Sequence, residues 1–315
     1  MTTPQKSSTG IPLRKFGRSD EMVSALALGG AHIGEMGNQR DAIKVVHAAI
    51  DGGITFLDNA WEYAEGKAEE RMGKALEKGW REKVFLMTKV CTHGRDRKVA
   101  MSQLKESLRR LKTDYLDLWQ VHECIYYSDP AQHFAPGGVI EALVEAKEKG
   151  LVRYVGFTGH KDPAIHLAML SYDFPFDSVQ MPLNCFDASF KSFERSALPA
   201  AIERGIAVLG MKSMSGEGDA VKKKVVTPQE ALRYAMSLPV TATVSGIDSM
   251  RVLKQNLAVA QNFTPMTQEE MQALRSRVSE FASDGRFELY KTTAKFDGPP
   301  GRKQHGFPSQ EKLEA

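Results

Sequence analysis

Four polar residues in the first half of the chain could together move a proton: Asp58, Tyr63, Lys89 and His122. Asp58, Lys89 and His122 each lie at the end of a strand-like apolar run, and Tyr63 follows in the loop after Asp58. An acid, a phenol, an amine and an imidazole can deliver a proton to a carbonyl oxygen. An ammonium stabilises a phenolate and is expected to lower the pKa of a tyrosine from its ordinary value near ~10. The residues therefore predict Tyr63 as the acid, Lys89 and Asp58 as the groups that tune it, and His122 as the group that orients the carbonyl.

Strand-like runs alternate with helix-like stretches from residue 22 to about residue 260. In the stretch 41–51, the apolar residues recur at i, i+3, i+4, i+7 and i+8, which makes one buried stripe along a helix. Gly52-Gly53 then ends the helix and leads into the next strand. The expected strands are 26–29, 55–57, 84–88, 116–121, 154–157, 179–181, 207–209 and 243–245. The expected helices are 41–51, 68–78, 99–111, 139–149, 163–171, 196–203, 228–236 and 250–260.

Eight strands alternating with eight helices predict an α/β fold, a closed (β/α)8 TIM barrel. The carboxyl ends of the strands then meet at one face, where barrel active sites lie, so the four residues are expected to come together. The rival fold is an open doubly wound sheet. It usually carries a glycine-rich phosphate loop after the first strand, and the segment 29–34 matches the GxGxxG pattern poorly.

Two segments lie outside the alternating pattern. Residues 11–25 predict a short β-hairpin that closes the N-terminal face of the barrel. Residues 267–282 predict an extra helix, and the tail 283–315 either drapes over the barrel mouth or is disordered. We expect one domain over residues 1–315, in which the hairpin is followed by the barrel at 26–262 and by the extra helix and tail at 267–315.

Composition excludes several classes of partner. The net charge of +3 and the absence of a basic run longer than 222–224 argue against nucleic acid. No apolar run approaches the ~20 residues that cross a bilayer, and residues 1–10 lack the apolar core of a signal peptide. The three cysteines are widely spaced and form no CxxC pair, which favours a reducing compartment over a metal or disulfide framework. A cytoplasmic protein that acts on a small carbonyl or alcohol is expected.

The four residues also carry a resemblance to a known family. The segments 56–63 and 69–76 resemble the first signature of the aldo-keto reductases, and Asp58, Tyr63, Lys89 and His122 match the Asp-Tyr-Lys-His tetrad of that family in order and spacing. The resemblance covers roughly residues 11–262. It implies a (β/α)8 barrel that reduces aldehydes or ketones to alcohols, reversibly, by hydride transfer from a nicotinamide dinucleotide held without a Rossmann fold.

The same resemblance implies cofactor contacts at the ends of several other strands. Thr158-Gly159 stands where relatives often have Ser-Asn, and Gln180 matches a glutamine that holds the nicotinamide carboxamide. Lys212 is in position to reach the pyrophosphate as a point charge. The full set of expected cofactor-binding residues is Gly30, Ala31, Thr158, Gly159, Gln180, Met211, Lys212, Ser213, Ser245, Gly246, Asp248, Gln255 and Asn256.

Three of these positions depart from the family pattern. Gly159 lacks the amide side chain, and Met211 replaces an aromatic residue with a thioether that makes a softer contact with the nicotinamide ring. Asp248 lies in the stretch where relatives that prefer NADP place lysine or arginine. An acidic residue beside the ribose favours a 2′-hydroxyl over a 2′-phosphate. The family resemblance implies NADP, whereas Asp248 favours NAD, and both cofactors stay open at this stage.

Two other functions are compatible with parts of the sequence. A regulatory cofactor-binding subunit of the channel β type shares the barrel and can keep the tetrad. A metal-dependent barrel hydrolase would draw its ligands from a set of acidic and histidine residues, but no HxH pair follows the first strand. That candidate set is His32, Asp58, His93, His122 and His160.

Overall fold

The chain folds into a closed barrel of eight parallel strands, in the order β10-β3-β4-β5-β6-β7-β8-β9. The structure is a computed structural model that describes residues 5–91, 96–294, 296–297 and 309. The predicted (β/α)8 barrel is therefore confirmed. The barrel strands are β3 (Leu26–Gly29), β4 (Phe56–Asp58), β5 (Phe85–Val90), β6 (Leu116–Val121), β7 (Val152–Thr158), β8 (Ser178–Pro182), β9 (Ala207–Met211) and β10 (Ala242–Gly246).

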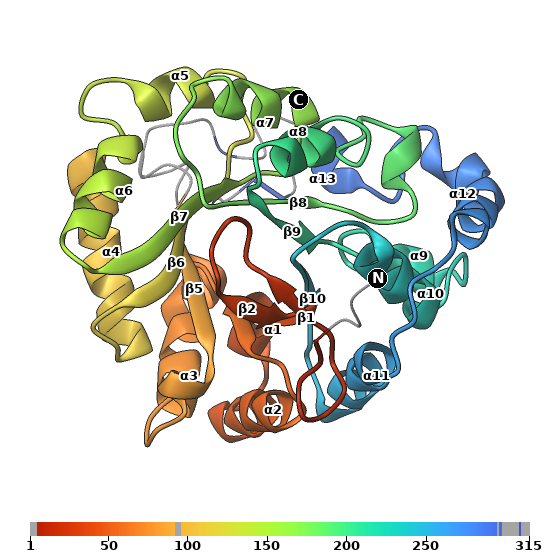
Figure 1. Cartoon of the computed structure of the whole chain (residues 1–315), viewed down its shortest axis with the longest axis horizontal. Coiled ribbons are helices and arrows are strands. Elements are labelled where there is room, and N and C mark those ends of the chain that lie inside the picture. Colours follow the sequence, from red (N-terminus) through yellow and green to blue (C-terminus); the bar gives the residue numbers. More distant parts are fainter. Residues whose placement is uncertain (1–4, 92–95, 295, 298–308, 310–315) are drawn as a thin grey trace.

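Helices surround the strands on the outside of the barrel (Figure 1). In α2, the predicted apolar stripe is buried against the strands, as its spacing requires. Several helices begin at a capping residue: Asp96 accepts hydrogen bonds from the amides of Lys98 and Val99, and Thr227 forms a capping box with Glu230. The outer helices are α2 (Gln39–Asp51), α3 (Lys67–Ala75), α4 (Arg97–Leu111), α6 (Val139–Glu148), α7 (Pro163–Leu170), α8 (Ala197–Glu203), α10 (Pro228–Ser237) and α11 (Met250–Gln261).

Short helical segments in the loops were not predicted, because a few residues are too short to show a helical period. They lie mostly at the carboxyl ends of the strands, where they shape the mouth of the barrel. They are α1 (Gly30–Glu35), α5 (Asp129–Phe134), α9 (Asp219–Lys222) and the 3-10 helices η1 (Tyr63–Gly66), η2 (Arg81–Lys83) and η3 (Asp187–Ser189).

The N-terminal hairpin consists of β1 (Leu13–Lys15) and β2 (Met22–Ser24) and lies across the barrel opening in red in Figure 1. Phe16 packs in the barrel interior, with its ring centroid 4.9 Å from that of Phe85 and 5.1 Å from that of Tyr154. Arg14 donates hydrogen bonds to the carbonyl oxygens of Met236 and Val240, which precede β10. These contacts lie at the amino ends of the strands, so the predicted hairpin closes the face opposite to the candidate site.

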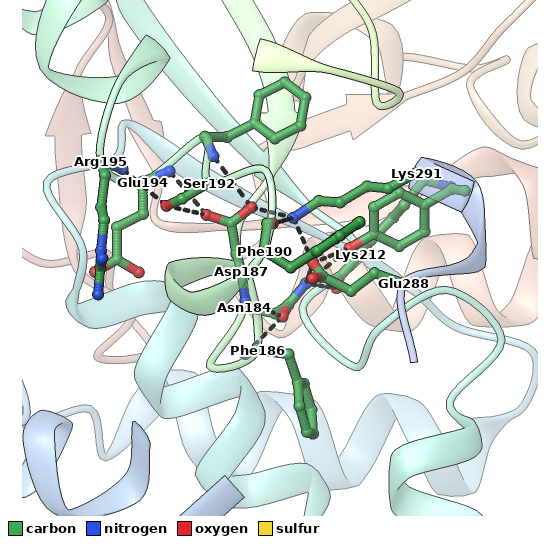
Figure 2. A network of polar contacts seen from close by, with 12 residues as sticks. Asn184, Phe186, Asp187, Phe190, Ser192, Glu194, Arg195, Lys212, Glu288 and Lys291 are labelled. Atoms are coloured by element: carbon green, nitrogen blue, oxygen red, sulfur yellow. Dashed lines mark hydrogen bonds and ion pairs between the residues drawn. The ribbon is translucent and has the colours of Figure 1, made fainter. Parts of the chain in front are cut away.

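The C-terminal part comprises α12 (Gln268–Ala282), close to the predicted extra helix, and α13 (Leu289–Thr292). A buried ion cluster fastens α13 to the loop after β8 (Figure 2). The ammonium of Lys291 lies 2.7 Å from Asp187 Oδ1 and 2.9 Å from Glu288 Oε1, and it donates a hydrogen bond of 2.8 Å to the carbonyl oxygen of Phe190. The side chains of Lys291, Asp187 and Glu288 are almost completely buried.

The tail beyond α13 also lies against loops at the carboxyl ends of the strands. Lys161, in the loop after β7, is 2.7 Å from Asp297 and donates to the carbonyl oxygen of Thr293. Through Asp297 the tail therefore drapes over this face of the barrel. Phe307 and most of the tail after Asp297 lie outside the described residues.

The Lys291 cluster leads to a stability prediction. Lys291→Met leaves two buried carboxylates without their shared cation, which typically costs about 3–5 kcal/mol. We expect the free energy of unfolding, measured by urea denaturation, to fall by about that amount. Lys254→Met is the matched control, because Lys254 is exposed on α11 and such a change is usually within about 0.5 kcal/mol of neutral. Equal stability of the two variants would show that the cluster does not fasten α13.

Candidate functional site

Three of the predicted residues meet at the carboxyl ends of β4 and β5. Lys89 Nζ forms an ion pair with Asp58 Oδ1, donates a hydrogen bond of 2.7 Å to the carbonyl oxygen of Asn59, and lies 3.4 Å from the hydroxyl oxygen of Tyr63. Lys89 is 1% exposed and Asp58 is 3% exposed. A charge so deeply buried needs a countercharge and hydrogen-bond acceptors, and Asp58 and Asn59 supply them.

A tight loop brings Tyr63 back over Lys89. Its start is fixed by a hydrogen bond of 3.0 Å from the amide of Trp61 to the carbonyl oxygen of Lys89, and by Arg110, which donates to the carbonyl oxygen of Trp61. The indole of Trp61 donates to Glu106, so the loop is also tied to α4. The loop continues as η1, which starts at Tyr63.

His122 completes the predicted group from the end of β6. Its amide donates to the carbonyl oxygen of Val90, and its ring lies edge-on to that of Tyr63, with centroids 5.7 Å apart and an angle of 88° between the planes. His122 Nδ1 is hydrogen-bonded to Glu62 Oε1 at 2.6 Å. The second oxygen of Glu62 accepts from Cys91 Sγ at 3.2 Å. The structure therefore gathers all four residues of the predicted set and adds a carboxylate to it.

The electrostatics of Tyr63 differ from the expectation that Lys89 would lower its pKa. Removal of the phenol from water raises the pKa of Tyr63 well above its ordinary value, and the negative charges of Asp58, Glu62 and Glu123 raise it further. Burial lowers the pKa of Lys89, against the opposing effect of Asp58. The sequence-based expectation fails because burial disfavours the phenolate, because three carboxylates add their negative charge, and because the ammonium is paired with Asp58. Tyr63 is therefore a neutral phenol at physiological pH.

The predicted cofactor-binding residues lie along the carboxyl ends of neighbouring strands. Thr158 ends β7, Gln180 lies in β8, Met211 ends β9 and Gly246 ends β10. Because these strands are consecutive in the barrel and β10 pairs with β3, the positions form one continuous arc. The other predicted positions follow the same strands: Gly30 and Ala31 after β3, Gly159 after β7, Lys212 and Ser213 after β9, Ser245 in β10, and Asp248, Gln255 and Asn256 after β10.

Three buried polar atoms on this arc have no hydrogen-bond partner among the described residues: Thr158 Oγ1, Gln180 Oε1 and Asn256 Oδ1. The opposite ends of two of these side chains are held, since Gln180 Nε2 lies 3.4 Å from Asp58 Oδ2 and Asn256 Nδ2 donates to Ser245 Oγ at 3.0 Å. Buried polar groups in folded proteins nearly always have a partner. An elongated polar ligand lying along the arc would supply those partners.

The structure gives a physical reason for the glycine at position 159. A β-carbon at Gly159 would lie 2.3 Å from the carbonyl oxygen of Cys124 and 2.9 Å from the ring of His166. The backbone of Cys124 is itself fixed by a hydrogen bond of 2.7 Å to the carbonyl oxygen of Thr158. The loop after β6 therefore occupies the space that an asparagine side chain would need.

Met211 and Asp248, the other two positions that differ from the family pattern, lie in different environments. Met211 is partly buried at the end of β9. Asp248 is exposed and accepts a hydrogen bond of 2.8 Å from Ser249, the residue that caps α11. Lys212, which follows Met211, contacts the C-terminal part of the chain. Its Nζ lies 5.1 Å from the ring centroid of Tyr290 and 5.0 Å from that of Phe296.

Sequence reasoning missed the acidic residues beside the predicted group. Glu62 directly precedes Tyr63, and Glu123 directly follows His122. Glu123 Oε2 lies 2.9 Å from Nδ1 of His160 and 3.9 Å from Nε2 of His122. Their positions directly beside candidate catalytic residues, in loops after barrel strands, could have identified Glu62 and Glu123 from the sequence.

The described residues give no support to a metal-dependent hydrolase. Within residues 5–91, 96–294, 296–297 and 309, no group of three or more His, Cys, Asp or Glu side chains is arranged to hold a metal ion. His93, one of the candidate ligands, lies outside this part. No helix in the same part is both long and apolar enough to pass through a bilayer.

Comparison with known proteins decides the family. The model of the Aldo/keto reductase family matches residues 25–226. The chain belongs to the aldo-keto reductase family. This membership makes it an oxidoreductase, and it agrees with the resemblance that the tetrad segment carries.

Individual aldo-keto reductases match over most of the chain. The "uncharacterized oxidoreductase YqkF" of Bacillus subtilis is 26% identical over 311 residues, which cover 85% of this chain and 96% of that protein. The holo form of aldo-keto reductase AKR11C1 from Bacillus halodurans is 26% identical, with a TM-score of 0.71, over 85% of this chain and 96% of that one. An aldo-keto reductase from Klebsiella pneumoniae in complex with NADPH shares the fold, with 23% identity and a TM-score of 0.69 over 87% of this chain and 95% of that one.

Proposed function

We propose that this aldo-keto reductase reduces aldehydes or ketones to alcohols, reversibly, with a nicotinamide dinucleotide as hydride donor and Tyr63 as general acid. One observation carries the proposal: the buried ammonium of Lys89 lies 3.4 Å from the hydroxyl of Tyr63 and is held in place by Asp58. The hairpin, the barrel and the C-terminal helices act in this proposal as one domain.

The proposed proton transfer follows from these contacts. A carbonyl oxygen that accepts a hydrogen bond from the Tyr63 hydroxyl gains negative charge as hydride reaches its carbon, and it then takes the phenolic proton. Lys89 stabilises the phenolate that this transfer leaves, while Asp58 and the carbonyl oxygen of Asn59 keep the ammonium in position. His122 orients the carbonyl from the end of β6. A well-placed general acid typically contributes about 10²–10⁴-fold to the rate.

The arc of strand ends fits a nicotinamide dinucleotide. Thr158 and Gln180 would hold the carboxamide, and Ser245 and Asn256 would hold the adenosine end, because Thr158, Gln180 and Asn256 each bury a polar atom there that makes no hydrogen bond to any described residue. When bound, the nicotinamide supplies the hydride. The Klebsiella pneumoniae relative, which shares the barrel, is in complex with NADPH.

The choice between the two dinucleotides depends on the loop after β10. Family membership favours NADP(H), whereas the exposed carboxylate of Asp248 would repel a 2′-phosphate and suit a 2′-hydroxyl. Arg251 is also exposed, in the first turn of α11, and would offset part of that repulsion. We propose that NADH is accepted at least comparably with NADPH.

Replacement of Tyr63 tests the proposed acid. Tyr63→Phe removes the donor hydroxyl but keeps the ring, so we expect carbonyl reduction in a panel of aldehydes and ketones to fall by about 10²–10⁴-fold. Cofactor affinity, measured by fluorescence titration, should stay near the wild-type value. Tyr127→Phe is the control, because Tyr127 is 73% exposed and its hydroxyl donates a hydrogen bond of 3.0 Å to Asp162.

Undiminished turnover in Tyr63→Phe would refute the assignment of the acid. Tight cofactor binding by the wild-type chain without turnover of any carbonyl would instead favour the regulatory cofactor-binding subunit.

The cofactor proposal is tested by steady-state kinetics with NADH and NADPH in parallel. We expect kcat/KM values of similar size, and we expect Asp248→Asn to raise kcat/KM for NADPH more than for NADH, because it removes a charge near the 2′ position. Glu280→Gln, an exposed change on α12, serves as the control for net charge. A preference for NADPH of about a hundredfold in the wild-type chain would contradict the proposal.

A further inference from the structure

The carboxylate of Glu62 joins the ends of three successive barrel strands. Glu62 belongs to the loop after β4, its Oε1 is bonded to His122 Nδ1 beyond β6, and its Oε2 accepts from Cys91 Sγ beyond β5. The side chain of Glu62 is 7% exposed and that of His122 is 12% exposed. Both oxygens of a nearly buried carboxylate are thus used to hold groups at the candidate site.

The loop that carries Glu62 is itself fixed. The amide of Trp61 donates to the carbonyl oxygen of Lys89, the carbonyl oxygen of Trp61 accepts from Arg110, and the amide of Tyr63 donates to the carbonyl oxygen of Ala60. Glu62 therefore reaches His122 from a rigid support, which favours a defined geometry for the pair.

The contact determines which nitrogen of His122 carries hydrogen. A carboxylate has only acceptor atoms, so the hydrogen in the 2.6 Å contact belongs to His122 Nδ1. His122 Nε2 is 3.9 Å from the nearest oxygen of Glu123, which is too far for a hydrogen bond. Nε2 is then the ring nitrogen that is left to meet a substrate oxygen.

The state of Nε2 has a direct consequence for the reaction. A ring with hydrogen on Nδ1 alone can only accept a hydrogen bond at Nε2. A ring with hydrogen on both nitrogens donates at Nε2, which suits a carbonyl oxygen. Because alcohol oxidation passes through the same transition state as carbonyl reduction, both directions need the ring that donates at Nε2 to the substrate oxygen.

We propose that Glu62 is a positioning residue, which fixes the orientation and the Nδ1–H tautomer of His122 and thereby aims Nε2 at the substrate oxygen. The inference rests on the proposed function, because the substrate oxygen is the group that Nε2 meets. Glu62 does not exchange the reacting proton, which still passes from Tyr63 to the carbonyl oxygen as hydride reaches the carbon.

Glu62 also acts on Tyr63 through its charge. It is one of the three carboxylates that raise the pKa of Tyr63, so its neutralisation should lower that pKa and bring the alkaline fall of carbonyl reduction to a lower pH. If Glu62 had a purely structural role, its neutralisation would leave the pH of this alkaline fall unchanged. The ionisable groups around the pair are Asp58, Tyr63, Lys89, Cys91 and Glu123, and His160 and Lys212 lie on the other side of Glu123.

The tautomer is tested first in the wild-type chain, by nitrogen-15 NMR of the histidine rings at alkaline pH. The His122 signals are identified by their loss in His122→Asn. We expect hydrogen on Nδ1 and a bare Nε2. Hydrogen on Nε2 instead would overturn the proposal, and this result needs neither a substrate nor a Glu62 variant.

The role in the reaction is tested with Glu62→Gln, which keeps the shape but loses the charge. We expect kcat for carbonyl reduction to fall by about 10- to 100-fold, the loss typical of one charge-assisted hydrogen bond, with an unchanged KM for the cofactor. The fall of kcat at alkaline pH should begin at a lower pH than in the wild-type protein. Glu65→Gln is the matched control, because Glu65 lies on the same loop, is exposed and pairs only weakly with Lys67 at 4.0 Å.

The outcomes separate the inference from the proposed function. If wild-type protein turns over carbonyls and Glu62→Gln keeps both its kcat and its pH profile, the role of Glu62 is refuted and the function stands. If wild-type protein turns over no carbonyl, the proposed function fails, and the NMR result still decides the tautomer.

Discussion

The buried ammonium of Lys89 is the constraint on which the candidate site depends. A positive charge that is 1% exposed must be paired and hydrogen-bonded, and this requirement draws Asp58, the carbonyl oxygen of Asn59 and the hydroxyl of Tyr63 to one point. The strands β4 and β5 bring the ion pair together because parallel barrel strands end at the same face. The loop that starts at Trp61 then needs only to fold back on itself to place the phenol.

The same physics fastens the C-terminal part of the chain to the barrel. Lys291 is as deeply buried as Lys89, and it is balanced by Asp187 and Glu288 (Figure 2). Tyr290, next to Lys291, accepts a hydrogen bond from Asn184 and faces Lys212 with its ring. A structural ion cluster thus lies next to the proposed cofactor loop, so the position of that loop is linked to the position of α13.

The sequence predicted the barrel, and it predicted that Asp58, Tyr63, Lys89 and His122 come together at one face, because both expectations depend on local patterns. Helical and strand periods locate the elements, and the strand ends locate Asp58, Lys89 and His122. Contacts between distant loops were not predictable in this way. The bond of Glu62 to His122 requires the course of the loop, and the clash at Gly159 requires the position of Cys124. The expected lowering of the Tyr63 pKa was wrong, because burial and neighbouring carboxylates raise it. Both depend on the fold and cannot be inferred from the spacing of residues.

The central claim is that burial and three surrounding carboxylates keep Tyr63 a protonated phenol beside a paired ammonium, ready to act as an acid. An ultraviolet titration of phenolate absorbance, taken as the difference between wild-type protein and Tyr63→Phe, measures this property without a substrate. The account predicts no ionisation of Tyr63 below about pH 10, the ordinary tyrosine pKa. Ionisation of Tyr63 near neutral pH would contradict it.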